Sequence, residues 1–281
     1  MSVLRVKFLI SQSILRHLFI LPYRVFLVGR NLMRVFNISL IWLAKRREFT
    51  NFTYELLPRN KEYLAWFVSN ACDISTEEVF SYFLEIESNS VLQKELSASI
   101  TSHKLGSDFA NGLFWGRRIG WYAIVRATKP DLVVESGTDK GLGSVVLSEA
   151  LLQNGSGRLI TIDINSESGW LIRGRHSFNT ERKIGSSLHV LQSIDQIDLF
   201  IHDSDHSQDY ESREYETIKA RLSSRGYVMS DNSHVTNSLS KWSLNNERNF
   251  MYFAEQPFNH WYPGAGIGIS LPSNLGVINK I

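Results

Sequence analysis

The 281-residue sequence predicts an α/β fold, a doubly wound and mostly parallel sheet with an N-terminal helical extension. Three observations support this prediction. From residue 131 onward, short β-rich runs alternate with loops and helical stretches. The first run, DLVVES, leads into a loop with glycines at 137 and 141, and two later apolar runs end in the acidic clusters DSDH and SDN. In such a sheet, ligands bind at the carboxyl ends of the strands.

The first 47 residues are both apolar and basic. They contain no Asp or Glu, and the remaining residues carry 21 basic against 28 acidic side chains, a net charge of −7. The apolar runs FLI, LFILPY, VFLV and LIWLA lie between the charges, a pattern typical of a helix on an anionic membrane surface. The nine basic residues are Arg5, Lys7, Arg16, Arg24, Arg30, Arg34, Lys45, Arg46 and Arg47.

The segment could also be a membrane-spanning helix, a signal peptide or a set of packed amphipathic helices. No uncharged run approaches the roughly 20 residues of a spanning helix, so we expect peripheral membrane contact and no spanning segment. Arg16 interrupts the stretch and no small-residue cleavage site follows, which argues against a signal peptide. Amphipathic helices packed on the domain, or on a second copy in a homo-oligomer, are an equal alternative. No nucleic-acid partner is expected, because aromatic and basic residues do not interleave in the main body.

Composition and cysteine content limit the size of the folded domain and the cellular compartment. A 43% hydrophobic chain of this length can bury one large domain with an appendage. Cys72 is the single cysteine, so no intramolecular disulfide can form, and a reducing compartment is expected. We therefore expect a cytoplasmic protein, peripheral at the inner face of the membrane. The predicted organisation is a basic amphipathic segment at 1–48, a helical cap or oligomerisation region at 49–128, and a ligand-binding domain at 129–281.

The elements follow in order along the chain. In STEEVFSYFLEIE, Ser75 or Thr76 is expected to cap a helix that has early glutamates. Its predicted apolar face consists of Val79, Phe80, Phe83 and Leu84. The predicted elements after Pro130 are a strand in DLVVES, a helix in GLGSVVLSEALLQNG, a strand in RLITIDI, a helix near 168–182, a strand near 187–191, a strand in IDLFIH, a helix in DYESREYETIKARLSSRG and a strand in YVMSD.

The loop ESGTDKGLG indicates a nucleotide-like ligand. Glycines at this turn let a ligand approach the backbone, and the following helix offers free N–H groups. GLGSVV lacks the third glycine of a dinucleotide fingerprint, and Lys140 is not followed by the Ser or Thr of a phosphate-binding loop. The second strand ends in Asp163, 28 positions after Glu135. A carboxylate there can accept hydrogen bonds from both ribose hydroxyls.

The order of these motifs resembles the class I S-adenosylmethionine-dependent methyltransferases, which have a Rossmann-like fold. The resemblance covers about residues 120–270 and rests on Glu135-x-Gly137-x-x-x-Gly141, Asp163, IDLFIHDSDHS and YVMSDN. It implies S-adenosylmethionine as cofactor, with residues 129–281 as its binding domain. The implied cofactor-binding residues are Glu135, Gly137, Thr138, Gly141, Asp163 and Asp203, with the glycines and Glu135 at the methionine end and Asp163 at the ribose. GSS at 185–187 departs from the family, where an acid often follows the glycine near adenine.

The two acidic clusters predict a shared site. In the expected sheet, Asp203 and Asp231 follow neighbouring strands, and with Asn232 they form a hard-oxygen set suited to Mg²⁺. This pattern resembles the metal-dependent O-methyltransferases, of which the sugar- and antibiotic-tailoring relatives are more similar. His206 or Asp205 is then expected to take the substrate proton. The structural alternatives are that Asp203 and Asp205 cap the next helix and that His206 bonds a backbone carbonyl.

These interpretations lead to one expected function and one alternative. We expect an S-adenosylmethionine-dependent enzyme that methylates a hydroxyl of a sugar or small polar acceptor with the help of a divalent metal. The alternative is a non-catalytic cofactor-binding or scaffold protein with the same fold, tethered through its basic N-terminus.

Overall fold

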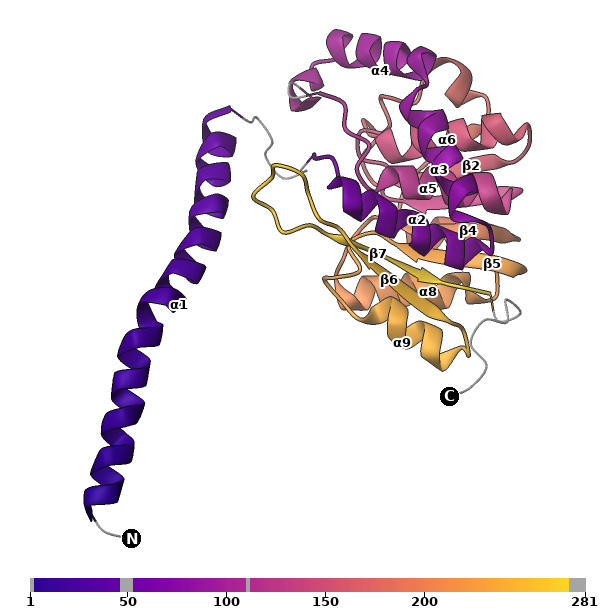
Figure 1. Ribbon diagram of the computed structural model, residues 1–281. Helices are drawn as coiled ribbons and strands as arrows, with labels where there is room; N and C mark the ends of the chain where they lie inside the picture. The colour runs from indigo at the N-terminus through magenta and orange to yellow at the C-terminus, as the bar shows by residue number, and fades with distance from the viewer. Residues whose placement is uncertain (1–2, 46–52, 110–111, 273–281) are drawn as a thin grey trace. The chain divides into compact units, whose positions relative to one another are not determined.

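The structure is a computed structural model, which describes residues 3–45, 53–109 and 112–272 (Figure 1). The chain divides into two compact units. One contains α1 (Val3–Lys45) and residues 259–262, and the other contains the rest of the described chain. The predicted boundary at residue 48 lies outside the described residues. The predicted helical region and the sheet fall within the same unit.

A seven-stranded sheet forms the centre of the second unit. Its order is β3-β2-β1-β4-β5-β7-β6, with β1 to β5 parallel and β7 antiparallel to both of its neighbours. The predicted doubly wound, mostly parallel sheet is therefore confirmed. The strands are β1 (Leu132–Ser136), β2 (Arg158–Asp163), β3 (Thr180–Ile184), β4 (Ile197–His202), β5 (Leu222–Ser230), β6 (Phe250–Ala254) and β7 (Gly266–Ser270).

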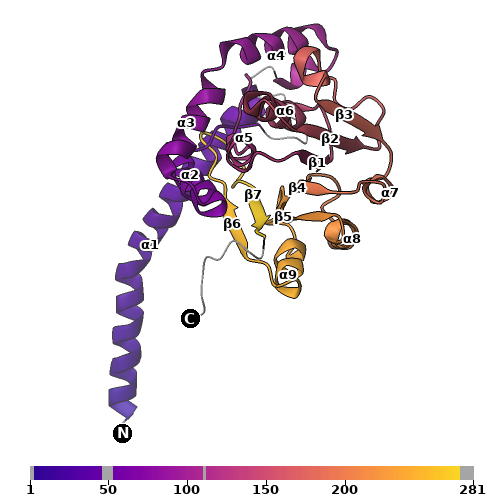
Figure 2. The ribbon, with the colours of Figure 1, turned by 90° about the vertical axis from the view of Figure 1, so that its right-hand side faces the viewer.

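Helices cover both faces of this sheet (Figure 2). On one face α7, α8 and α9 contribute Leu191, Tyr215 and Trp242 to a core that also includes Val134 and Phe200 from the strands. The other face is covered by α5 and α6, which pack against each other. The helices after α1 are α2 (Pro58–Cys72), α3 (Thr76–Glu87), α4 (Ser90–Ser102), η1 (Gly106–Phe109), α5 (Arg118–Thr128), α6 (Leu142–Asn154), η2 (Gly174–Ser177), α7 (Ser187–Leu191), α8 (Gln208–Lys219) and α9 (Ser238–Asn245).

The strand register aligns the ends that carry the predicted site. Ser136 at the end of β1 pairs with Ile162 of β2 and with His202 of β4, and His202 pairs with Ser230 of β5. The strand order reverses direction between β1 and β4, which is the position where open α/β sheets bind ligands. The loops after β1, β2, β4 and β5 therefore meet at one edge of the sheet.

Two predicted elements between β2 and β4 are wrong. The structure has the short helix η2 and the strand β3 where a helix at 168–182 was expected, and the helix α7 where a strand near 187–191 was expected. β3 is an edge strand, and four of its five residues are exposed. Because its conformation depends on pairing with β2, its sequence TERKI shows no apolar alternation.

The predicted face of α3 is partly correct. Ser75 caps the helix by accepting a hydrogen bond from the Glu78 backbone N–H at 3.2 Å. Val79 and Phe83 are buried, as expected, whereas Phe80 and Leu84 are 42% and 66% exposed. The helix packs against both α2 and α5, so the second partner determines which of its apolar residues are covered.

The N-terminal segment is one continuous helix. α1 runs for 43 residues, and Ile20–Lys45 is long and apolar enough to cross a membrane by length and composition. The short uncharged runs in the sequence did not suggest this, because they are separated by single arginines.

Candidate active site

The glycine loop after β1 is shaped by a close approach to the loop after β4. Gly137 has a φ of +93°, and a Cβ added there would lie 1.9 Å from the carbonyl oxygen of Asp203. Only glycine fits such a position. The Gly137 backbone N–H donates to the Ile162 carbonyl at 2.8 Å. The loop is thereby held against the ends of both β2 and β4.

Asp163 at the end of β2 fixes the conformation of the same loop. Its carboxylate accepts hydrogen bonds from the backbone N–H groups of Thr138 at 3.0 Å, Asp139 at 2.9 Å and Asn165 at 2.8 Å. A carboxylate offers about four acceptor positions, so capacity remains for a ligand hydroxyl. The next residue, Ile164, is 80% exposed and presents an apolar surface beside this carboxylate. We did not predict Ile164 as a site residue from the sequence, although its position directly after Asp163 at a strand end could have indicated one.

Glu135 and Thr138 lie beneath the loop. Thr161 donates to Glu135 Oε2 at 2.7 Å, Ser144 donates to the same oxygen, and the Thr138 and Thr161 hydroxyl oxygens are 2.6 Å apart. Burial raises the pKa of Glu135 to about 7, although both hydroxyl hydrogen bonds oppose the shift. The Glu135 side chain is fully buried, so in this structure it supports the loop from below.

Asp203 and Asp231 lie together at the ends of β4 and β5. The parallel pairing of these strands was predicted, and the two carboxyl groups are close enough to shift each other's pKa. Burial and the adjacent charge of Asp231 raise the pKa of Asp203 well above its ordinary value. For Asp231, burial alone would raise the pKa, but the Arg117 guanidinium outweighs it and the pKa is lowered. Asp203 is therefore the more readily protonated member of the pair, and Asp231 the more readily ionised one.

Arg117 is the main site residue that our sequence reasoning missed. Its Nε donates to Asp231 Oδ1 and its Nη2 donates to Asp231 Oδ2, a two-point pair with a fully buried carboxylate. Nε also lies 3.6 Å from Glu255 Oε1, and the Tyr54 hydroxyl donates to Glu255 Oε2 at 2.8 Å. The only signal for this residue was the basic pair in WGRRIG, because its partners are more than 100 residues away in sequence.

His206 lies on the open side of the acidic pair. Its Nε2 is 3.0 Å from the Asn232 side-chain nitrogen and 3.8 Å from Asp203 Oδ1, and its Nδ1 is 3.7 Å from Glu211 Oε1. The ring is 23% exposed. Asp205 is placed differently: it is exposed, and its carboxylate accepts the Ser207 backbone N–H at 2.9 Å in the turn before α8. Of the two predicted proton acceptors, only His206 lies beside the acidic pair.

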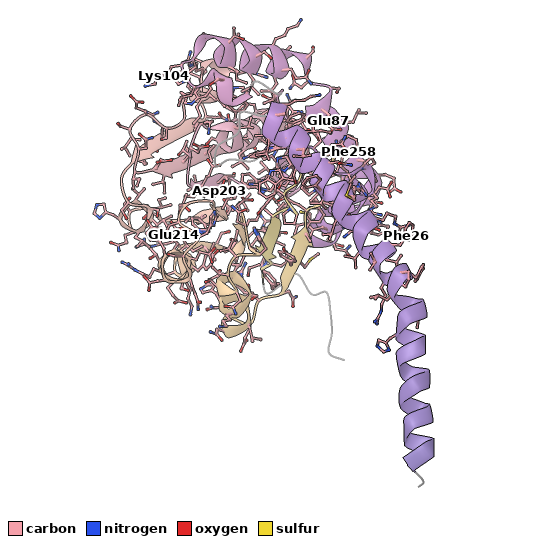
Figure 3. The ribbon with its side chains drawn as sticks, turned by 90° about the vertical axis from the view of Figure 1, so that its left-hand side faces the viewer. Phe26, Glu87, Lys104, Asp203, Glu214 and Phe258 are labelled. Atoms are coloured by element: carbon pink, nitrogen blue, oxygen red, sulfur yellow. The ribbon has the colours of Figure 1, made fainter. Side chains whose placement is uncertain are left out.

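A buried network behind His206 contains His202. The His202 ring is 2.5 Å from Glu214 Oε2 through Nδ1 and 3.3 Å from Glu211 Oε1 through Nε2. Burial lowers its pKa, but the two glutamates outweigh burial and raise the pKa to about 9. His202, His206 and Glu211 bring their ligand atoms within 4.8 Å of one another, a spacing a metal ion could use. His202 pairs with Glu214 through Nδ1, whereas His202 Nε2, His206 Nδ1 and Glu211 Oε1 are buried and have no hydrogen-bond partner among the described residues. Figure 3 labels Asp203 and Glu214, which belong to the two neighbouring networks.

Comparison with known proteins agrees with this geometry. Residues 134–233 match the family model described as a methyltransferase domain. This part of the chain is similar to that family's domain. The match begins within β1 and ends just beyond Asp231, so it includes the glycine loop and both acidic clusters. The predicted resemblance to class I S-adenosylmethionine-dependent methyltransferases is thereby confirmed.

Two solved structures share the fold of this chain. The O-methyltransferase TomG from Streptomyces achromogenes, involved in tomaymycin synthesis and solved in complex with SAM, has a TM-score of 0.50 and 16% identity, over 64% of this chain and 90% of TomG. The cofactor-bound protein Rv0187 from MTB has a TM-score of 0.50 and 13% identity, over 63% of this chain and 86% of that protein. No curated protein matches the sequence. At these identities the likeness establishes the fold.

Arg117 engages both carboxylate oxygens of Asp231, one of the predicted metal ligands. A divalent cation at Asp203, Asp231 and Asn232 would need ionised carboxylates with free lone pairs directed at it. Both oxygens of Asp231 are engaged by Arg117, and the pKa of Asp203 is raised. Asn232 contacts His206 through Nδ2, so this contact does not engage the amide oxygen that a metal would use. A guanidinium therefore supplies the positive charge that we expected from Mg²⁺.

Arg118 is a second cation beside this site. Its Nε is buried and has no hydrogen-bond partner among the described residues. Burial and repulsion from Arg117 lower its pKa, while Asp203 opposes this shift. The Arg118 charge also acts on Glu135, so its guanidinium lies near both the glycine loop and the acidic pair. An unpartnered buried donor of this kind suits an anionic group of a ligand.

Proposed function

We propose that this protein transfers the methyl group of S-adenosylmethionine to a hydroxyl oxygen of a small polar acceptor, such as a sugar. The observation that carries the proposal is the meeting of three features at one edge of the sheet. These are the Gly137 loop, the Asp163 carboxylate and the His206 imidazole, which follow β1, β2 and β4. The family match over residues 134–233 and the O-methyltransferase activity in the name of TomG support it.

Each part of the cofactor has a matching group in the proposal. The glycine loop from Gly137 to Gly141 lets the methionine end approach the backbone, and the unpartnered Nε of Arg118 suits its carboxylate. Asp163 retains acceptor capacity for the ribose hydroxyls, and the exposed Ile164 offers an apolar surface for the adenine. When bound, S-adenosylmethionine supplies an electrophilic methyl carbon attached to a sulfonium.

His206 has the proton-transfer role. Its Nε2 takes the proton from the acceptor hydroxyl as the oxygen forms its bond to the methyl carbon and the carbon–sulfur bond breaks, leaving a neutral thioether. Glu211, near Nδ1, orients the ring and stabilises the charge that it gains. The acceptor hydroxyl takes the place of the Asn232 amide beside Nε2. Apo hydrogen bonds in such sites are often long, so the 3.7 Å separation from Glu211 is compatible with this role.

The proposal contains no metal-assisted step. Arg117 pairs with both oxygens of Asp231, and the pKa of Asp203 is raised, so the acidic pair has less need of another cation. Positioning of the acceptor and its proton transfer therefore depend on residues of the chain. The non-catalytic alternative is not favoured, because the imidazole and the cofactor-loop features that turnover needs are all present.

The test separates cofactor binding from turnover. Isothermal titration of S-adenosylmethionine into the full chain is expected to show binding that Asp163→Ala weakens and His206→Gln leaves within about threefold. With a panel of sugar and phenol acceptors, the unmodified protein is expected to form S-adenosylhomocysteine, whereas His206→Gln loses about 10²–10⁴-fold in rate. Absence of cofactor binding would contradict the whole proposal. Binding without turnover on any acceptor would instead support the scaffold alternative.

A further inference from the structure

The basic side chains of helix α1 lie on one side of it, with apolar residues such as Ile20, Leu27 and Ile41 between them. With about 100° per residue, the basic residues of Ile20–Lys45 fall with Asn31 and Asn37 within an arc of about 140°. These basic residues are Arg24, Arg30, Arg34 and Lys45. The remaining arc of about 220° contains one polar side chain, Ser39. Its hydroxyl donates to the Val35 carbonyl of the same helix at 2.8 Å, so the face presents no free hydroxyl proton.

The wide face is apolar and exposed along its length. Phe26 is 58% exposed and Leu43 is 69% exposed, and the side chain of Phe26 extends from the helix in Figure 3. The large apolar residues of this face, all exposed, are Leu21, Val25, Phe26, Val28, Leu32, Met33, Val35, Phe36, Leu40 and Leu43. A contiguous apolar surface of this extent requires a partner, because exposed patches of this size mark interaction sites.

We propose that α1 lies in the plane of an anionic lipid bilayer, with this wide face in the acyl region and Arg24, Arg30 and Arg34 at the headgroups. Charge complementarity identifies the partner: the first 47 residues contain nine basic and no acidic residues. Such a helix, with an apolar face and a basic polar face, binds an anionic interface parallel to its surface. In this arrangement the chain is a peripheral protein at an anionic leaflet. This assignment does not depend on the proposed catalytic function.

A second copy of α1 and a membrane-spanning arrangement both account less well for this helix. A second copy of α1 covers a stripe of about 100°, roughly half of the apolar arc, so a helix pair leaves the rest exposed. A membrane-spanning arrangement would place Arg24, Arg30 and Arg34 at intervals through the hydrocarbon, where each arginine is costly. An in-plane helix satisfies both faces at once, because the basic arc faces the headgroups over the whole length.

The proposal is tested by flotation of the full chain with preformed vesicles. Neutral phosphatidylcholine vesicles are compared with vesicles that also contain phosphatidylglycerol, at low and high salt. The triple variant Arg24→Gln, Arg30→Gln, Arg34→Gln is expected to bind anionic vesicles roughly 100-fold more weakly, since each basic residue near an anionic surface contributes about a fivefold factor. The control with the same charge change, Lys94→Gln, Lys219→Gln, Lys241→Gln on exposed sites of the other unit, is expected to bind as the unmodified protein does.

A second variant tests the apolar face. Leu32→Glu with Phe36→Glu is expected to abolish flotation with both kinds of vesicle, while S-adenosylmethionine titration and circular dichroism verify that the other unit is folded. Equal flotation with neutral and anionic vesicles, unaffected by the arginine changes, would overturn the in-plane arrangement in favour of insertion. Failure of the unmodified chain to float, with a dimer in sedimentation that the Glu variant dissociates, would overturn the lipid assignment in favour of a second copy.

Discussion

Arg117 and Asp231 form a buried two-point ion pair, although they are 114 positions apart in the sequence. The Asp231 side chain is fully buried and that of Arg117 is 11% exposed. The pair links the residue before α5 to the residue after β5, and Glu255 and Asp203 lie beside it. Its planar donors match both oxygens of the carboxylate, which a lysine ammonium does not reproduce.

Removal of the Arg117 charge is expected to destabilise the protein strongly. Arg117→Gln leaves Asp231 ionised and buried without its partner, a change that costs about 3–5 kcal/mol in comparable pairs. Arg117→Lys keeps the charge but loses the two-point geometry, so an intermediate loss is expected. Urea unfolding monitored by circular dichroism measures both. Arg158→Gln, which breaks an exposed pair with Glu181, is the control and should cost less than about 1 kcal/mol. A similar small loss for Arg117→Gln would contradict the structural role of the pair.

Metal removal is expected to leave the protein unaffected at this site. Because Arg117 occupies both oxygens of Asp231, dialysis against EDTA should change neither S-adenosylmethionine affinity nor the rate of methyl transfer. Titration calorimetry and S-adenosylhomocysteine formation measure the two effects, and the control is the same dialysis with excess Mg²⁺. Activity that disappears with EDTA and returns only with Mg²⁺ would show that the pair opens to admit a cation.

Substitution of Gly137 is expected to disrupt the glycine loop. An alanine Cβ would lie 1.9 Å from the Asp203 carbonyl oxygen, so the loops after β1 and β4 must separate. We expect Gly137→Ala to lose at least about 3 kcal/mol of stability, through the clash and the positive φ together, and to abolish cofactor binding. Gly155→Ala is the matched control, since Gly155 has a φ of +70° but open space around it, and should cost about 1 kcal/mol. Equal losses in thermal unfolding would mean that the close approach is absent in solution.

Stability is expected to fall as the pH rises from 7 to 9. Glu211 and Glu214 raise the pKa of His202 to about 9 in the folded state, against 6.5 for the free side chain. A raised histidine pKa stabilises the fold fully below about pH 6.5, and this contribution is lost as the pH rises through 9. Glu135, with its pKa raised to about 7, changes the free energy of unfolding mainly below pH 7. We expect a loss of roughly 2–3 kcal/mol, measured by urea unfolding at pH 7 and pH 9.

Two histidine variants give this pH prediction its controls. His202→Gln should unfold with nearly the same free energy at both pH values, because it removes the group that titrates in this window. His189→Gln, at an exposed site on α7, should keep the pH dependence of the unmodified protein. A pH dependence that survives in His202→Gln would assign it to other groups.

The sequence by itself determined the sheet and the edge where the site forms. β1, β2 and β4 are apolar runs that glycine or acidic residues follow, so local pattern was sufficient. Only the second half of β5 was predicted, because residues 222–226 were wrongly assigned to the preceding helix. It also placed Asp203, His206, Asp231 and Asn232 near one another, because parallel neighbouring strands end at the same edge. These features depend on periodicity and turn chemistry within a few residues.

Only the tertiary structure decided what these residues do. β3 is a strand because it pairs with β2, and its own residues carry no pattern that shows this. The chemical state of Asp231 depends on Arg117, which reaches it from a helix on another part of the chain. Pairing, burial and charge neutralisation act through space between residues far apart in sequence, so a pattern of carboxylates that predicted a metal instead holds a guanidinium.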